Sequence, residues 1–155
     1  MTIAIERGGE RHLAGWASLR AALWPDQNVE QHRGELAEML AAASDRDFAC
    51  VALTDEGGCA GFAEAALRTD YVNGCETSPV VFLEGIFVAP AYRRSGIARK
   101  LCRAIENWGR SRGCLEFGSD AAIDNAASLA LHHALGFLET ERVVFPEGTR
   151  KARCR

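Results

Sequence analysis

The sequence lacks most of the patterns that would assign a small protein to a class at once. Its 155 residues contain no run of about 18 apolar residues, the length that a membrane-spanning helix requires. No apolar segment follows a basic stretch near the N-terminus, as it would in an export signal. With 18 basic and 21 acidic residues, the net charge of -3 provides no general attraction for nucleic acids. We therefore expect a cytoplasmic protein that binds neither membranes nor nucleic acids.

The six cysteines also lack the spacing of a metal site. No two of them are separated by two residues, and none of the four histidines joins a cysteine at ligand spacing. Because no export signal accompanies them, scattered reduced thiols are favoured over disulfides. None has a neighbouring helix start or histidine that would mark it as a nucleophile. The sequence therefore predicts neither a metal ion nor a covalent acyl-enzyme.

The remaining composition is that of an ordinary globular protein. Apolar residues make up 48% and charged residues 25% of the chain, and no repeat or low-complexity segment interrupts it. A chain of this length fits one compact domain. We therefore expect a single domain over residues 1–155.

Hydrophobic periodicity predicts alternating groups of strands and helices. Helices are expected at 12–24, 30–43, 96–112 and 125–134. Strands are expected at 2–6, 48–54, 59–68, 79–90, 114–120 and 138–145, with a tight hairpin at 55–58 and a buried strand at 79–90. The order β-α-α-β-β-β-α-β-α-β predicts an α/β protein, an α+β mixed sheet flanked by helices.

A basic, glycine-containing turn joins the strand at 79–90 to the helix at 96–112. Residues 88–98 read VAPAYRRSGIA, and a helix N-terminus of this kind binds phosphate through free amides. The alternative is an ordinary turn with two solvated arginines. ATP and dinucleotide sites fit poorly, because neither GK[ST] nor GxGxxG is present.

In this strand-turn-helix setting, RRSGIA (93–98) resembles the Arg/Gln-x-x-Gly-x-Gly/Ala signature of the GNAT acetyltransferase superfamily. A second feature, Asn125 opening a helix that ends in ALGF (134–137), is similar to the family's Asn to Leu-Gly-Phe segment. Closer resemblance to bacterial aminoglycoside 6′-N-acetyltransferases lies in LW (23–24), DYVNGCETSPVVFLEGIFV (70–88), SDAAIDN (119–125) and LGFLETERVVF (135–145).

The resemblance implies a GNAT fold with a central, mostly antiparallel sheet, and acetyl-CoA as co-substrate. It implies that the backbone of 86–88 pairs with pantetheine, that 94–99 hold the pyrophosphate, and that Asn125 contacts the cofactor arm. The implied cofactor-binding residues are Ile86, Phe87, Val88, Arg94, Ser95, Gly96, Ile97, Ala98, Arg99 and Asn125.

The implied substrate is a small polycationic aminoglycoside, which requires carboxylates in its pocket. Glu84 interrupts an apolar strand that is expected to be buried, and a structural partner such as an arginine is the alternative. Asp120 ends a strand, where a turn or capping role is the alternative, and Glu141 could lie on a solvated face. The resemblance implies substrate-binding roles for Trp24, Gln27, Tyr71, Glu84, Asp120 and Glu141.

The expected mechanism is direct attack of the 6′-amine on the thioester in a ternary complex, with Asp120 as catalytic residue. His132 stands where many family members carry a tyrosine that protonates the thiolate; a surface or capping histidine is the favoured interpretation. Acetylation of another amine, such as a peptide N-terminus, lysine or polyamine, and a non-catalytic acetyl-CoA sensor remain alternative functions. Family analogy implies a homodimer.

Overall fold

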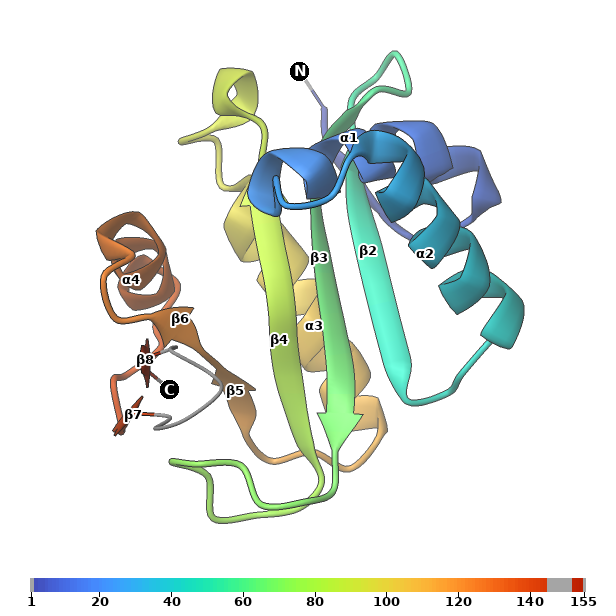
Figure 1. Cartoon of the computed structure of the whole chain (residues 1–155). Helices are drawn as coiled ribbons and strands as arrows, with labels where there is room; N and C mark the ends of the chain where they lie inside the picture. Colours follow the sequence, from blue (N-terminus) through green and yellow to red (C-terminus); the bar gives the residue numbers. More distant parts are fainter. Residues whose placement is uncertain (1, 145–151, 155) are drawn as a thin grey trace.

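The computed structural model describes residues 2–144 and 152–154. The main elements follow the expected order closely (Figure 1). They are β1 (Ala4–Arg7), α1 (Leu13–Leu23), α2 (Val29–Ala42), β2 (Asp47–Leu53), β3 (Cys59–Arg68), β4 (Val80–Val88), α3 (Ile97–Ser111), β5 (Phe117–Ser119), β6 (Ala121–Ala122), α4 (Ala126–Ala134), β7 (Arg142–Val144) and β8 (Ala152–Cys154). Short 3-10 helices at Glu10–His12 and Pro90–Tyr92 precede α1 and α3.

The main sheet contains five strands in the order β1-β2-β3-β4-β5. The first four strands are antiparallel to their neighbours, and only β5 runs parallel to its neighbour β4. Helices α1 and α2 cover one face of this sheet and α3 covers the other (Figure 1). The expected mostly antiparallel sheet flanked by helices is confirmed.

Helix α3 shows why the hydrophobic pattern predicted its position well. Ile97, Leu101, Ile105 and Trp108 are all buried against the sheet, as their spacing requires. No helix in the described part of the chain is long and apolar enough to span a membrane.

The last third of the chain differs from the expected strands. The strand expected at 114–120 contains only Phe117–Ser119, and Leu115 is 84% exposed. The strand expected at 138–145 contains only Arg142–Val144, and residue 145 lies outside the described residues. Alternation alone overestimated both strands, because a strand also requires a neighbour that completes its hydrogen bonds.

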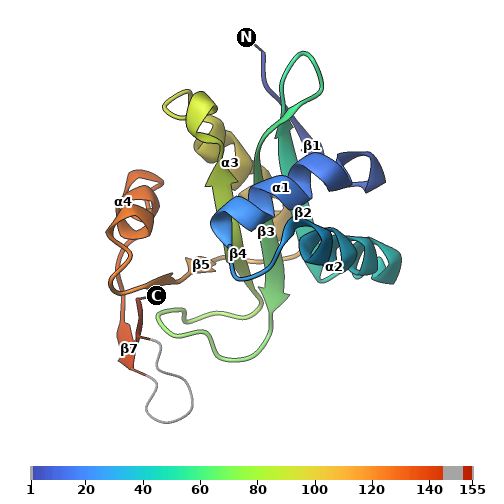
Figure 2. The same ribbon diagram turned by 45° about the horizontal axis from the view of Figure 1, so that its top comes forward.

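A second, small sheet has the strand order β6-β8-β7. Ala152–Cys154 forms β8 and pairs with both β6 and β7. Figures 1 and 2 show this sheet and α4 together on one side of the main sheet. The sequence contained no strand signal for Ala152–Cys154, which depends on partners from two other segments.

Strand β4 carries an irregularity at its centre. Glu64 of β3 pairs with Gly85, and the next residue, Ala65, pairs with Leu83. Glu84 is therefore the extra residue of a β-bulge, a feature that redirects side chains and is frequent beside active sites. The side chains of β4 therefore lose the regular alternation of a strand at this residue.

Candidate active site

Along the second half of β4, no described strand pairs with the edge that faces β5. The parallel pairing of β4 with β5 covers only Val81 to Leu83, where Leu83 is opposite Ser119. Beyond that point no pairing with β5 is described, so the backbone groups of β4 after Leu83 that point away from β3 have no described strand as partner on that edge. An extended ligand can add to such an edge in the manner of a further strand.

The turn after β4 forms an exposed loop that ends at the N-terminus of α3. Arg94 and Gly96 have left-handed backbone conformations, with φ of 61° and 79°. Gly96 is the N-cap of α3, and no atom lies within 4 Å of the position a Cβ would occupy. The first amides of α3 have no intrahelical acceptor, so they and the helix dipole can bind an anion. Ile97 offers only its amide, because its side chain is buried in the core.

Three side chains in and after this loop donate hydrogen bonds to backbone carbonyls. Arg93 Nε donates to the carbonyl of Val88 at 2.9 Å, and Ser95 Oγ donates to the carbonyl of Tyr92 at 2.5 Å. Arg99 donates to the carbonyl of Ala134 at 3.3 Å, which links α3 to α4. Arg93 and Ser95 therefore join the loop to the end of β4 and to the short 3-10 helix that follows it.

Two residues of the α4 region have structural partners. Asn125 Oδ1 accepts from the Ser128 amide at 3.1 Å and so caps α4. His132 Nδ1 donates to the carbonyl of Ser128 at 2.7 Å, and its Nε2 lies 2.7 Å from Ser119 Oγ. His132 is half-buried at the β4–β5 separation. Both ring nitrogens therefore have structural partners, and the interpretation of His132 as a surface or capping histidine stays a prediction.

A cavity of about 390 Å³ lies beside β3 and β4 on the face covered by α1 and α2. It brings together three of the expected substrate residues, Trp24, Gln27 and Glu84. Its volume falls in the range of small-molecule sites. The other lining residues are Arg20, His32, Met39, Asp47, Phe48, Glu64 and Ala65.

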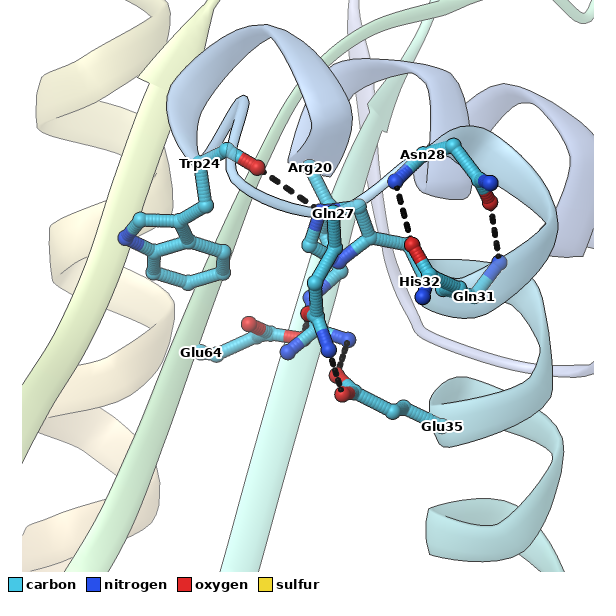
Figure 3. Close-up of polar contacts among 8 residues, drawn as sticks. All are labelled: Arg20, Trp24, Gln27, Asn28, Gln31, His32, Glu35 and Glu64. Carbon is cyan, nitrogen blue, oxygen red and sulfur yellow. Dashed lines mark hydrogen bonds and ion pairs between the residues drawn. The ribbon is translucent and has the colours of Figure 1, made fainter.

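The Trp24 indole is positioned by a close approach to β4. A Cβ at Gly85 would lie 2.4 Å from the indole, so only glycine leaves room for it. Trp24 also makes an edge contact with Phe62, and its carbonyl accepts from Nε2 of buried His32 at 2.9 Å. The aromatic wall of the cavity is therefore held by packing and one hydrogen bond (Figure 3).

Glu84 corrects the expectation of a buried carboxylate. Its side chain is 41% exposed and pairs with Arg68 at 3.0 Å. The bulge accounts for the difference, because it gives Glu84 no partner on β3. The arginine that was weighed as a structural alternative is therefore present, at the rim of the cavity.

The buried carboxylate is instead Glu64, which the sequence analysis missed. Glu64 is 6% exposed and lies 3.3 Å from Nε of Arg20, which also contacts Glu35 at 3.2 Å (Figure 3). Burial raises the pKa of Glu64 to about 7, and the nearby Glu84 and Glu35 add to this effect against the opposing charge of Arg20. The argument that selected Glu84, a carboxylate within an apolar strand, applies equally to Glu64.

The other expected substrate residues lie apart from this cavity. Asp120 directly follows β5 and lines a second cavity of about 400 Å³ with Ser119 and His132. Because Leu83 pairs with Ser119, the Asp120 and Glu84 backbones stand at the same level where the strands part. Tyr71, which is 73% exposed, and Glu141, also exposed, line neither cavity.

Four of the five described thiols are poor nucleophiles. All five cysteines whose side chains the structure describes are free. Burial raises the pKa of Cys50 and of Cys102 to about 12, and it also raises those of Cys59 and Cys114. These thiols stay protonated near neutral pH. Within residues 2–144 and 152–154, no group of three or more metal-binding side chains could hold an ion.

The open edge of β4 and the exposed turn before α3 lie within the part of the chain that a family model matches. The model of the acetyltransferase (GNAT) family matches residues 16–137, and the chain belongs to this family.

Its relatives within the family share one activity by name. An aminoglycoside N(6′)-acetyltransferase type 1 of Serratia marcescens is 50% identical over 134 residues, which cover 86% of this chain and 90% of the relative. The enzyme of the same name from Acinetobacter genomosp. 13 is 48% identical over 136 residues, covering 88% and 91%.

Solved structures agree with these sequence relatives. The aminoglycoside 6′-N-acetyltransferase AAC(6′)-Ih from Acinetobacter baumannii has a TM-score of 0.89 and 44% identity, and the match covers 96% of this chain and 99% of that one. AAC(6′)-Iy in complex with a bisubstrate analogue, CoA-S-monomethyl-acetylneamine, has a TM-score of 0.87 and 43% identity, with the same coverage.

The raised pKa of Glu64 predicts a pH-dependent stability. The native state holds this proton more tightly than the unfolded chain, so its contribution is present at low pH and lost as pH rises from 4.5 through 7. Glutamine does not titrate, so the free energy of unfolding of Glu64→Gln should not show this decrease. For the wild type the decrease is about 3 kcal/mol, at about 1.4 kcal/mol per pKa unit. Urea unfolding at pH 5 and pH 8 measures this change in the free energy of unfolding.

The exposed control Glu38→Gln should keep the wild-type pH dependence. An unchanged pH dependence in Glu64→Gln would contradict the raised pKa of Glu64.

Proposed function

We propose that this protein is an aminoglycoside 6′-N-acetyltransferase that uses acetyl-CoA and confers antibiotic resistance. The observation that carries the proposal is the similarity of nearly the whole chain to enzymes of that name, at 45–50% identity for several. The open edge of β4 and the accessible start of α3 support the use of acetyl-CoA. The carboxylates around the first cavity support a polycationic amine as acceptor.

Acetyl-CoA supplies the activated acetyl group as a thioester. The backbone of Ile86, Phe87 and Val88 pairs with the pantetheine arm, and one of these amides donates to the thioester carbonyl as negative charge develops on its oxygen. The turn and first helical residues bind the pyrophosphate: Arg94, Ser95, Gly96, Ile97, Ala98 and Arg99. Asn125 contacts the cofactor arm and caps α4 at the same time.

The aminoglycoside binds where the α1–α2 connection, β4 and the end of β5 meet. Trp24 provides an aromatic wall, with Gln27 and Glu84 on the same cavity. Tyr71 and Glu141 contact outer parts of the substrate from the exposed segments that carry them. Trp24 and Gln27 belong to the α1–α2 connection, whereas Asp120 follows β5, so the site joins two halves of the sequence.

Acetyl transfer proceeds by direct attack in a ternary complex. Asp120 accepts a proton from the 6′-ammonium, and the neutral nitrogen forms a bond to the thioester carbon while the carbon–sulfur bond breaks. The thiolate of CoA leaves and takes up the proton that the nitrogen releases as the amide forms. A carboxylate is a weak base for an ammonium, so most of the rate comes from positioning and desolvation of the amine.

The protein acts as a homodimer in the cytoplasm. The outer edges of β6 and β7 are available for pairing with a second copy, since β8 occupies only the space between them. The free state of all five described cysteines suits a reducing compartment.

The proposed activity predicts one product. Incubation with acetyl-CoA and tobramycin should release the CoA thiol and yield a mono-acetylated antibiotic with the acetyl group on the 6′-nitrogen. Thiol release and NMR assignment of the product measure this. Transfer only to peptides, lysine or polyamines would indicate another amine as substrate, and binding of acetyl-CoA without thiol release would indicate a sensor.

The role of Asp120 predicts a rate effect. Asp120→Asn should lower kcat by about 100-fold, the lower range for loss of a general base. The measurement is kcat against pH with saturating acetyl-CoA. Near-normal turnover across the pH range would remove Asp120 from the mechanism.

The loop before α3 predicts an effect confined to acetyl-CoA. Gly96→Ala forces a Cβ into a left-handed conformation, a strain of about 1–2 kcal/mol, so the KM for acetyl-CoA should rise roughly tenfold. Gly113→Ala is the matched control, because Gly113 has φ of 83° and equal space but follows the other end of α3. An equal rise of the KM for acetyl-CoA in both variants would show that backbone strain alone causes the effect, and would remove the loop before α3 from the acetyl-CoA site.

A further inference from the structure

The loop between β3 and β4 is held by a carboxylate from another part of the chain. Glu116 immediately precedes β5, and its Oε1 accepts from the Glu76 amide at 2.8 Å, the Thr77 amide at 2.7 Å and the Thr77 hydroxyl at 2.5 Å. These hydrogen bonds, with that of the Thr77 hydroxyl as the largest cause, hold the pKa of Glu116 below its usual range. The carboxylate is therefore charged near neutral pH, and a charged acceptor binds its donors more strongly than a neutral one.

The backbone of Glu116 is itself fixed to the main sheet. Its carbonyl accepts from the amide of Val81 in β4 at 3.2 Å, and the next residue begins β5. Figure 1 shows the β3–β4 loop at the lower ends of these two strands, near the chain that enters β5. The loop is therefore joined to the start of β5 as well as to the two strands that it connects.

The same loop carries an exposed aromatic side chain. Val72 is 3% exposed and packs with Val80 and Phe82, whereas its neighbour Tyr71 is 73% exposed. A tyrosine has an apolar ring and a polar hydroxyl, which suits contacts with ligands that carry both kinds of group. The place of the Tyr71 ring depends on how the loop is held.

The loop also contacts the segment that carries Glu141. Gly74 lies so close to Thr140 that a Cβ at Gly74 would collide with the Thr140 side chain. Tyr71 is three residues before Gly74, and Glu141 directly follows Thr140. The two expected substrate residues that line neither cavity therefore lie on segments that touch each other.

Part of the loop borders the cavity that Asp120 lines. Residues 73–75 contribute to this cavity of about 400 Å³, together with Glu116 and residues 135–140. The hydrogen bonds to Glu116 therefore hold a segment that lies between the exposed Tyr71 and the cavity of the proposed catalytic residue.

We propose that Glu116 is a positioning residue for the acceptor substrate, because its hydrogen bonds hold the β3–β4 loop so that Tyr71 and Glu141 can both contact the aminoglycoside. This rests on the proposed function, which assigns those two residues to the substrate. Glu116 acts only through the loop. Its effect is confined to the aminoglycoside, since the loop precedes β4 whereas the turn that binds acetyl-CoA follows it.

Steady-state kinetics of Glu116→Ala and Glu116→Gln test this role. Alanine removes the acceptor of all three hydrogen bonds, so the KM for tobramycin should rise about tenfold while the KM for acetyl-CoA stays unchanged. Glutamine keeps a carbonyl oxygen that can accept from the same donors. A neutral acceptor is roughly half as strong as a charged one, so the rise in Glu116→Gln should be about threefold.

Glu76→Ala is the matched control. It removes a carboxylate from the same loop and keeps the amide that Glu116 binds, so its KM for tobramycin should equal the wild-type value. Thr77→Val is a milder second variant, which removes only the hydroxyl donor and should raise the KM for tobramycin about threefold. Urea unfolding shows which variants fold, and Thr77→Val provides the test if Glu116→Ala does not.

Three results would overturn the positioning role of Glu116. They are a wild-type KM for tobramycin in the folded variants, an equal rise in Glu116→Ala and Glu116→Gln, which would show an effect of charge alone, and an equal rise of the KM for acetyl-CoA, which would show a general structural defect. In each case, acetylation of tobramycin by the wild type leaves the proposed function intact. Absence of tobramycin acetylation by the wild type overturns both.

Discussion

Strand β4 is hydrogen-bonded to β3 along nearly all its length but to β5 over only three residues, and the candidate site depends on this difference. Up to Leu83, the two parallel strands lie side by side; after it, one edge of β4 is free of any described strand. The free edge leads directly into the turn and start of α3. An extended ligand with a phosphate at one end could therefore follow a single path from strand to helix.

Strand β4 also contains the bulge at Glu84, which shapes the cavity beside it. A regular strand would place Glu84 opposite a residue of β3 and would turn Gly85 to the other face. The bulge instead leaves Glu84 at the rim of a cavity and brings Gly85 against Trp24. Glu64, opposite Gly85, then remains as a buried acid whose proton the surroundings retain up to about neutral pH.

Two arginine side chains pair with carboxylates of this region. Arg20 reaches from α1 across to Glu64 and Glu35, while its guanidinium lies 5.0 Å from the Trp24 ring centre. Gln27 donates to Glu35 at 2.6 Å and, as the largest cause, holds the pKa of that carboxyl below its usual range. The α1–α2 connection is thereby joined to the sheet through polar contacts that also form one side of the cavity (Figure 3).

The sequence by itself determined the elements whose signal is local. Helical spacing predicted α3, apolar runs predicted β2 to β4, and the RRSGIA segment predicted a turn that leads into a helix, because each pattern depends on neighbours a few residues away. Only the tertiary structure decided that Glu64 and not Glu84 is buried, that Ala152–Cys154 is a strand, and that His132 meets Ser119. These outcomes depend on register, a bulge and pairing between distant segments, and a one-residue change of register moves a side chain to the opposite face of a sheet.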